Sequence, residues 1–416
     1  MTPPVTASSF LRPIFVHPYP VPAPHAALVR IFHLAVALAE LAELEEVVQA
    51  GPGGGEARVV EIWTGPLGRS AAECFRWAGV EPHPGVRLRS VFDAAEVAAR
   101  GGAGRRARAA ALDAALKSAL AVFAASRPPR PALVLRGEAG AELLVGRLAR
   151  RASGQEILIH ELHRPARAPW RPWPRLRLRR TERQAVEGAD ALLLVSEALG
   201  DDLARRFRLP GAVLVSPSGA PPPVAAPPAD GGRDLDLLYV GKLEARKGVD
   251  LLLRAVAELP GHRLLLAGGG PRQEAACRRR ARRLGVADRV EFTGFLPPRE
   301  IPALLARARV GVCPLPAGRD PVSDRYTSPM KLLEMMAAGL PVVATAVPPV
   351  TRLVRPRTDA LVVPPNDPEA LARALLELSR DRALAHRLAA SALERAAEHD
   401  WRHRARALDR FLATLA

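Results

Sequence analysis

The sequence is poor in the features that mark secreted, membrane-spanning or nucleic-acid-binding proteins. Its three cysteines, Cys74, Cys277 and Cys313, lie far apart and form neither a CxxC pair nor a disulfide framework. No apolar run approaches the roughly 20 residues that a membrane span requires, and residues 1–12 lack the segments of a signal peptide. Aromatic residues make up only 4% of the chain, which leaves few platforms for stacking nucleobases. We therefore expect a soluble cytoplasmic protein that does not bind nucleic acid.

Lysine is also scarce, although the chain is strongly basic. Among 60 basic residues there are four lysines, Lys117, Lys242, Lys247 and Lys331. A compact ammonium is not interchangeable with a planar guanidinium at an anion site, so lysines kept in an arginine-rich chain indicate specific tasks. The formal net charge of +17 favours acidic partners. The alternative is a uniform compositional preference for arginine, in which part of this charge has no specific partner.

Apolar strands alternate with helical patterns along the whole chain. This alternation is typical of parallel sheets covered by helices on both faces, and 416 residues suffice for two such domains. The Pro- and Gly-rich residues 219–232 are expected to link a domain of residues 1–218 to a second one of residues 233–395. Residues 396–416 are expected to form a helix that returns to the first domain. Strands are expected at residues 14–16, 58–63, 86–91, 132–135, 157–162, 191–195, 212–215, 235–240, 263–267, 290–293, 310–313, 342–344 and 361–363.

The most clearly bounded helix is predicted within residues 326–344, YTSPMKLLEMMAAGLPVVA. Ser328 is the expected N-cap and Pro329 the first helical residue. Gly339 ends the helix before an apolar strand at residues 342–344. The helix is therefore short, and its first turn follows directly from the sequence.

A lysine stands in that first turn, where the helix macrodipole disfavours a cation. An anion bound at the helix start would remove the misfit, because Lys331 and the free N–H groups would share it. Glu334 follows three residues later on the same face. The alternative is a surface Lys–Glu pair that contributes little.

Three other predicted strands end in glycine turns. They are Gly241-Lys242-Leu243-Glu244-Ala245-Arg246-Lys247-Gly248, Gly268-Gly269-Gly270-Pro271 and Thr293-Gly294-Phe295. None fits a Walker loop, and no GxGxxG follows a predicted strand, which argues against a dinucleotide oxidoreductase. In open α/β sheets ligands bind at the carboxyl ends of strands, so we expect these turns to form a binding site.

The three turns and the helix of residues 326–344 resemble, in order and spacing, the retaining glycosyltransferases of family 4, which have the GT-B fold. The resemblance implies two doubly wound, Rossmann-like domains that face a cleft, the first binding the acceptor and the second a nucleoside-diphosphate sugar. Lys242 and Lys247 match the basic pair that holds the donor diphosphate. Glu334 matches a glutamate that binds the ribose, and His163 a histidine that reaches the transferring sugar. The other donor-binding residues implied are Gly241, Gly269, Gly270, Gly294, Phe295, Ser328, Pro329 and Lys331.

The sequence departs from the family at one position of this motif. The first of two glutamates that the family spaces by seven residues falls at Tyr326, and Asp324 is one candidate to replace it. At the end of the strand of residues 157–162, His160 and His163 could instead be structural. No third ligand accompanies them, so no metal site is expected there.

The chemistry implied by the resemblance is sugar transfer with retention of configuration to an acceptor hydroxyl of a glycan or a lipid-linked glycan. Negative charge develops on the departing nucleoside diphosphate, and fixed cations with helix N-termini can stabilise it as a metal would. We therefore expect no metal and no cofactor. The alternative, raised by Tyr326, is an inactive relative that only binds nucleotide or glycan.

A membrane surface is a further expected partner. The segment from Arg164 to Arg183 carries eight arginines with Trp170 and Trp173, a composition that can lie on anionic lipid. It would place the protein at the inner face of the membrane. The alternative is a solvated loop that the general arginine bias made basic.

Overall fold

The computed structural model describes residues 12–17, 26–49, 59–64, 70–90, 131–136, 157–163, 182–226, 232–318, 320 and 322–415. Contacts divide the chain into two units, one of residues 1–217 with 404–416 and one of residues 218–403. The segment Arg164–Arg183, expected on a membrane, lies outside the described residues except for its last two. Within the described residues no helix is long and apolar enough to cross a membrane.

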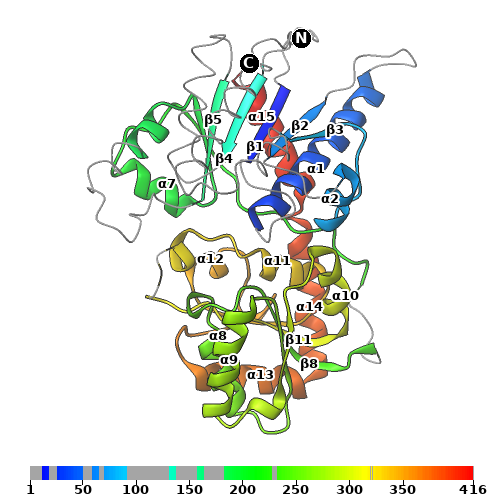
Figure 1. Cartoon of the computed structure of the whole chain (residues 1–416), viewed down its shortest axis with the longest axis vertical. Helices are drawn as coiled ribbons and strands as arrows, with labels where there is room; N and C mark the ends of the chain where they lie inside the picture. The colour runs from blue at the N-terminus through cyan, green and yellow to red at the C-terminus, as the bar shows by residue number, and fades with distance from the viewer. Residues whose placement is uncertain are drawn as a thin grey trace, which may run out of the picture. The chain divides into compact units, whose positions relative to one another are not determined.

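The first unit contains a parallel sheet with the strand order β3-β2-β1-β4-β5-β6-β7 (Figure 1). Strands β5 and β6 are short, mostly apolar runs that are buried along their whole length, as sheets covered on both faces require. Between residues 29 and 42, helix α1 carries apolar residues on all sides, and most of them are buried. The elements are β1 (Arg12–His17), α1 (Ala26–Gln49), β2 (Val60–Thr64), α2 (Ala71–Trp77), β3 (Val86–Ser90), β4 (Pro131–Arg136), β5 (Ile157–Leu162), β6 (Ala191–Leu194), α7 (Glu197–Ala204) and β7 (Ala212–Val215).

The second unit is also doubly wound, with the strand order β10-β9-β8-β11-β12-β13. One face of its sheet packs on α8 and α13 through Leu252, Val256 and Leu371, and the other on α11 and α14. Its strands are β8 (Leu235–Val240), β9 (Leu264–Ala267), β10 (Val290–Gly294), β11 (Ala308–Cys313), β12 (Val342–Thr345) and β13 (Leu361–Val363). Its helices are α8 (Val249–Ala257), α9 (Pro271–Arg283), α10 (Ile301–Arg307), α11 (Met330–Ala337), α12 (Pro348–Thr351), α13 (Pro368–Arg380) and α14 (Arg382–Ala397), with a 3₁₀ turn at Ala245–Lys247 and a π turn at Val322–Tyr326.

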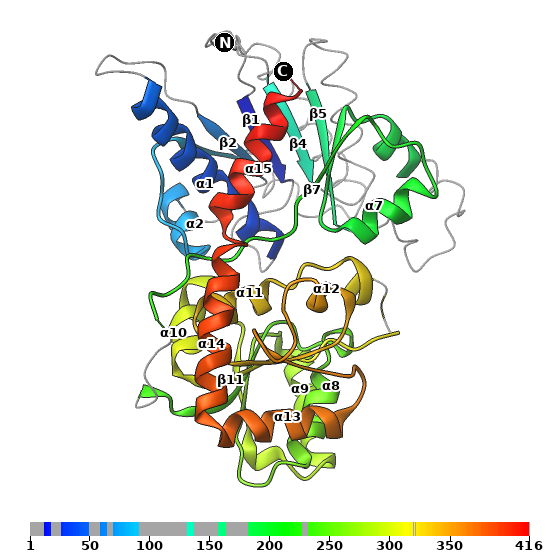
Figure 2. The ribbon, with the colours of Figure 1, turned by 180° about the vertical axis from the view of Figure 1, so that it is seen from behind.

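The C-terminal region is helical, as expected, but it is interrupted. Asp381 ends α13, and its side chain accepts a hydrogen bond from Leu384 N–H, so it starts α14. Helix α15 (Trp401–Ala413) follows, and its residues from Arg404 on group with the first unit. Figure 2 shows α15 against the strands of that unit.

The segment expected as a linker packs on the second unit where it is described. Ala220 N–H donates to His399 O at 2.7 Å, and Val224 N–H donates to Ala337 O at 2.9 Å. A Cβ on Gly219 would lie 2.6 Å from Trp401 Cδ2, so the backbone passes directly against this indole. The contacts therefore place the boundary between the units before this segment, at residue 217.

Chain order in the second sheet reverses between β8 and β11, which are neighbours at its centre. At such a switch point the loops after the two strands turn to opposite faces and leave room for a ligand at the carboxyl edge. Gly248, after β8, meets the residue that follows β11 there. A Cβ on Gly248 would lie 1.6 Å from Pro314 O, and its φ of +80° is one that L side chains rarely adopt.

We predict that Gly248→Ala lowers the free energy of unfolding by more than about 4 kcal/mol, because the backbone of the switch point must move. Gly285→Ala is the matched control. Gly285 also has a positive φ, of 69°, but has open space around it, so its cost is on the order of 1–2 kcal/mol. Urea unfolding of both variants measures the difference. Equal losses of unfolding free energy in the two variants would show that Gly248 is required for its φ and not for its contact with Pro314.

Candidate functional site

The three glycine turns of the second unit lie against one another at the carboxyl edge of its sheet. Gly268, with φ +121°, donates its N–H to Gly294 O at 2.8 Å. A Cβ on Gly268 would lie 2.4 Å from Gly241 O, so only glycine allows this approach. The structure therefore brings together the turns that the sequence singled out after β8, β9 and β10.

Lys331 reaches the same edge from the first turn of α11. Its Nζ lies 3.9 Å from the centroid of the Tyr239 ring and would be 3.4 Å from a Cβ on Gly241. The ammonium is shielded from solvent and has no hydrogen-bond partner in the described part of the chain. A buried cation without a partner is costly, so this atom indicates that a ligand supplies the missing negative charge.

The surrounding charges explain how this edge behaves electrostatically. Burial lowers the pKa of Lys331 to about 8, and the nearby Lys247 lowers it further, whereas Cys313 and Glu334 oppose the shift. Burial also raises the pKa of Glu334 to about 7, against the effect of Lys331. The pKa of Lys247 is lowered by burial and by Arg246. Two mutually repelling ammonium groups at one sheet edge favour an anion.

The two lysines expected to hold a diphosphate differ in exposure. Lys247 is half-buried at the end of the 3₁₀ turn, whereas Lys242 is exposed. The backbone of Lys242 is fixed, because Tyr239 Oη donates to its carbonyl at 2.8 Å. The sequence identified both lysines but missed Tyr239, which supports Lys331 through its ring and the turn through its hydroxyl. In the sequence, Tyr239 is marked only by its position near the end of an apolar strand.

The predicted N-cap of α11 is wrong by one residue. Pro329 occupies the cap position, with no side-chain cap, and the helix begins at Met330. The hydroxyl of Ser328 instead accepts a hydrogen bond from Ser218 N–H at 2.9 Å. The N–H of Ser218 therefore binds the hydroxyl that a helix cap would use. This hydrogen bond links the start of α11 to the segment that precedes β8. Gly339, with φ +63°, ends the helix as expected.

Tyr326 and Asp324, the residues at and near the missing glutamate, lie in the π turn. Tyr326 is buried, 5% exposed. Asp324 Oδ2 accepts from Gly318 N–H at 2.6 Å, and its Oδ1 is shielded without a hydrogen-bond partner among the described residues. The carboxylate therefore holds the turn after β11 through its Oδ2.

Two further features complete this edge. Phe295 is 51% exposed and is the one exposed aromatic side chain among the described residues. Gln273 joins the turns, since its Oε1 accepts from Gly270 N–H at 3.1 Å and its Nε2 donates to Glu244 at 3.2 Å. Nothing in the sequence marks Gln273 beyond its place in the first turn of α9.

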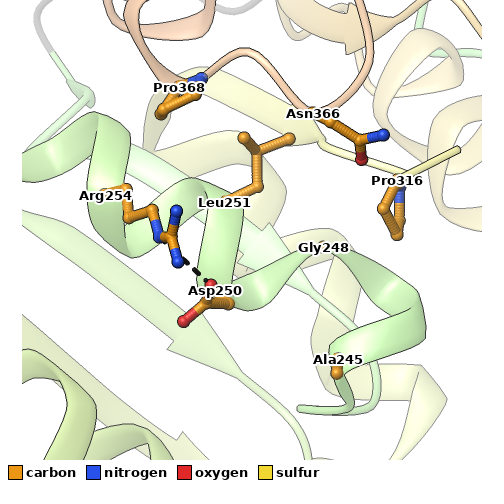
Figure 3. Close-up of a pocket in the computed structure, with 8 residues that line it drawn as sticks. All are labelled: Ala245, Gly248, Asp250, Leu251, Arg254, Pro316, Asn366 and Pro368. Carbon is orange, nitrogen blue, oxygen red and sulfur yellow. Dashed lines mark ion pairs between the residues drawn. The ribbon is translucent and has the colours of Figure 1, made fainter. Parts of the chain in front are cut away.

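A pocket beside this edge lies between the start of α8 and the loops after β11 and β13 (Figure 3). Asp250 in it is paired with Arg254 at 3.2 Å and with Arg280 at 2.6 Å, so its charge is already satisfied. Asn366 holds the far wall by two hydrogen bonds with Ala317. We assign no ligand to this pocket. It is lined by Ala245, Gly248, Asp250, Leu251, Arg254, Pro316, Asn366 and Pro368.

His163, the predicted contact of the first unit, belongs to a buried charge cluster at the end of β5. Its Nε2 lies 3.1 Å from Glu161 Oε1 and its Nδ1 lies 3.3 Å from Arg30 Nη1. Arg30 and Arg404 also approach Glu161 Oε1, at 3.4 and 3.6 Å. The imidazole is thus oriented by an acceptor on one nitrogen and a donor on the other. His160 packs separately, and burial lowers its pKa to about 4.

Metal-binding clusters were also considered. Among the described residues no group of three or more His, Cys, Asp or Glu side chains is arranged to hold a metal ion. The three cysteines are free and buried.

Comparison with known proteins agrees with this geometry. Residues 234–381, most of the second unit, match the family model described as Glycosyl transferases group 1. This part of the chain is similar to the group 1 glycosyltransferases. This confirms the resemblance drawn from the three glycine turns and α11.

Two curated relatives illustrate the similarity. The putative colanic acid biosynthesis glycosyltransferase WcaL of Salmonella typhimurium is 33% identical over 153 residues, 36% of this chain and 37% of that protein. The GDP-mannose-dependent alpha-(1-6)-phosphatidylinositol monomannoside mannosyltransferase of Mycolicibacterium smegmatis is 31% identical over 264 residues, 59% of this chain and 66% of that protein. The chain spans about half the length of the curated relatives it matches.

Solved structures share the fold over nearly the whole chain. Sucrose-phosphate synthase from Thermosynechococcus elongatus superposes with a TM-score of 0.68 at 23% identity, covering 97% of this chain and 99% of that one. HepE of Anabaena, in complex with UDP and glucose, gives a TM-score of 0.68 at 16% identity, with 97% and 100% covered. The predicted GT-B fold class is confirmed.

We predict that Lys331→Met stabilises the ligand-free protein by on the order of 2 kcal/mol at pH 7, because a pKa lowered by burial means that the charged form weakens the fold. The gain is full below pH 8 and shrinks as pH rises towards 10.5, where the lysine is neutral in both states. Lys242→Met, at an exposed lysine, is the control and should change stability little. Thermal unfolding at pH 7 and pH 10 measures both; a loss of stability in Lys331→Met at pH 7 would contradict it.

We also predict that Glu161→Gln destabilises the first unit by about 3 kcal/mol or more, since removing one partner leaves buried guanidinium groups without their carboxylate. Glu187→Gln is the control, because its pair with Arg183 is exposed and contributes about 0–1 kcal/mol. Chemical denaturation of both variants provides the comparison. Similar small losses would show that the cluster is not a structural ion pair.

Proposed function

We propose that this protein is a glycosyltransferase that moves a sugar from a nucleoside-diphosphate sugar to an acceptor hydroxyl. The observation that carries the proposal is the gathering of glycine turns and lysines at the switch point of the domain that matches group 1 glycosyltransferases. Glycine turns let a ligand approach the backbone, and Lys247 with Lys331 supplies positive charge for a diphosphate. Phe295 and Glu334 stand at the same edge for the nucleoside.

Transfer with retention of configuration and without a metal is part of this proposal. The negative charge that develops on the departing diphosphate needs preorganised positive groups, and the lysines with the start of α11 supply them. His163 is proposed to contact the transferring sugar, with its ring held by Glu161 and Arg30.

For the acceptor we propose a glycan or lipid-linked glycan. Relatives are described as acting in colanic acid biosynthesis and on a phosphatidylinositol monomannoside, a lipid-linked glycan. The arginine-rich segment at residues 164–183 suits an anionic membrane surface at the cytoplasmic face. Binding to liposomes that contain anionic lipid tests this surface separately from activity.

Tyr326 favours a second candidate, an inactive protein that keeps the nucleotide site. The residue is buried and offers no carboxylate to a donor sugar. The comparisons favour an enzyme, since the curated relatives described above are named as transferases.

A thermal-shift panel of UDP, GDP, ADP and TDP should identify one diphosphate that stabilises the wild type, by about 2.7 kcal/mol at 100 times its dissociation constant. Lys247→Ala and Glu334→Ala should lose the response, and Arg279→Ala, an exposed arginine on α9, should keep it. The sugar nucleotides of that base are then assayed for transfer to glycan and lipid acceptors. Binding without transfer or donor hydrolysis would favour the inactive candidate, and no binding at all would refute the donor site.

A further inference from the structure

Helix α9 carries a row of exposed arginines along one side. Arg272, Arg279 and Arg283 are seven and four residues apart, a spacing that places them on one line along a helix. All three are exposed, and Arg282 is exposed beside the last two. The opposite side of the helix is buried. We call these four residues the α9 arginine row.

The α9 arginine row forms no ion pair with any residue that the structure describes. The one acidic residue of the helix, Glu274, lies on another side and is bound by Arg278 at 2.7 Å. Exposed arginines elsewhere in the second unit do have carboxylate partners, as Arg307 has in Asp234 at 2.6 Å. The charges of the row are therefore not balanced by the protein around them.

Local structure explains only part of this row. The helix macrodipole favours Arg282 and Arg283 in the last turn, but it disfavours Arg272 in the first. Like charges three and four residues apart also repel each other, as Arg279 does with the two arginines that follow it. An anionic partner bound along the row would offset both unfavourable effects.

The shape of the row indicates a flat partner. Helix α9 packs on α8 and β10 and turns the row outward (Figure 1). From Arg272 to Arg283 the helix rises by about 16 Å. The exposed residues between the arginines are Ala275 and Ala276, which are too short to form the walls of a groove. Guanidinium groups bind phosphates through paired hydrogen bonds, so a plane of phosphates can contact the whole row at once.

We propose that the α9 arginine row binds the surface of an anionic lipid bilayer. The contact is electrostatic, because this side of the helix offers only alanines between its arginines and nothing that inserts among the lipids. Each arginine near such a surface strengthens partitioning by about 5-fold. The proposal goes beyond the proposed function, since it concerns a different surface of the second unit and does not depend on sugar transfer.

Cosedimentation of the full chain with vesicles of equal parts phosphatidylcholine and phosphatidylglycerol tests this surface. A variant with Arg279→Gln, Arg282→Gln and Arg283→Gln should show a partition coefficient about 100-fold lower than that of the wild type, because three charges near the lipid are lost. Arg272 is left unchanged, since it follows the glycine turn of the candidate donor site. Binding of the wild type should weaken at high salt and be absent on phosphatidylcholine alone.

A control variant removes the same charge from other exposed positions of the second unit. It carries Arg352→Gln, Arg373→Gln and Arg387→Gln, all outside α9, and should keep most of the binding to vesicles. Thermal unfolding separates a binding role from a structural one. The variant of the row should unfold at the wild-type temperature or above, since glutamine is a good helix former and relieves the repulsion.

Three results would overturn the proposal. Equal losses of vesicle binding in the two variants would show that net charge alone causes it. Wild-type binding by the variant of the row would show that the row does not contact lipid. A variant that keeps vesicle binding but loses binding to dextran sulfate would make the partner a linear polyanion. If no nucleoside diphosphate stabilises the protein but vesicle binding depends on the row, the donor site is refuted and this proposal stands.

Discussion

The candidate site of the second unit is organised around one unfavourable interaction, the burial of the Lys331 ammonium at the edge of the sheet. Each neighbouring element contributes to holding it there. Strand β8 provides the Tyr239 ring, the turn after it provides a glycine that leaves room, and α11 fixes the lysine in its first turn. These contacts fix the ammonium without neutralising it. A site built in this way is prepared for a negative charge before the ligand arrives.

The same requirement accounts for the backbone around the lysine. Gly268 meets the Gly241 carbonyl and Gly248 meets the Pro314 carbonyl at distances that no side chain permits. The first contact joins the loops after β8 and β9, and the second joins the loops after β8 and β11 at the switch point of the sheet. The space next to the lysine is therefore bounded by backbone, which does not change its shape through rotamers.

Most of the fold follows from the sequence because each signal is local. The expected strands are all present within a few residues, since short continuous apolar runs bounded by turns are typical of parallel sheets. The glycine turns and Lys331 were also identified locally. What could not be predicted depends on partners far along the chain. Ser328 was assigned as a helix cap, but Ser218, 110 residues away, takes its hydroxyl.

Burial is the other property that a sequence does not display. Lys242 and Lys247 look equivalent in the turn, yet tertiary packing exposes one and half-buries the other. Likewise, the sequence places His163 close to Glu161 at the end of β5, but it does not show that Arg30 and Arg404 join them from helices at the two ends of the chain. The electrostatic character of both clusters therefore depends on contacts with residues that are distant in the sequence.

The positions of Lys331 and Glu334 on α11 connect the charge argument to recognition. Three residues apart, they lie on one face with Cβ atoms about 5–6 Å from each other. Burial brings their pKa values to about 8 and about 7, from ordinary values of 10.5 and 4.5. Neither charge therefore cancels the other fully near neutral pH. A ligand that places a phosphate at the lysine and a hydroxyl one turn away satisfies both groups at once, whereas a lone anion would satisfy the lysine and be repelled by the glutamate.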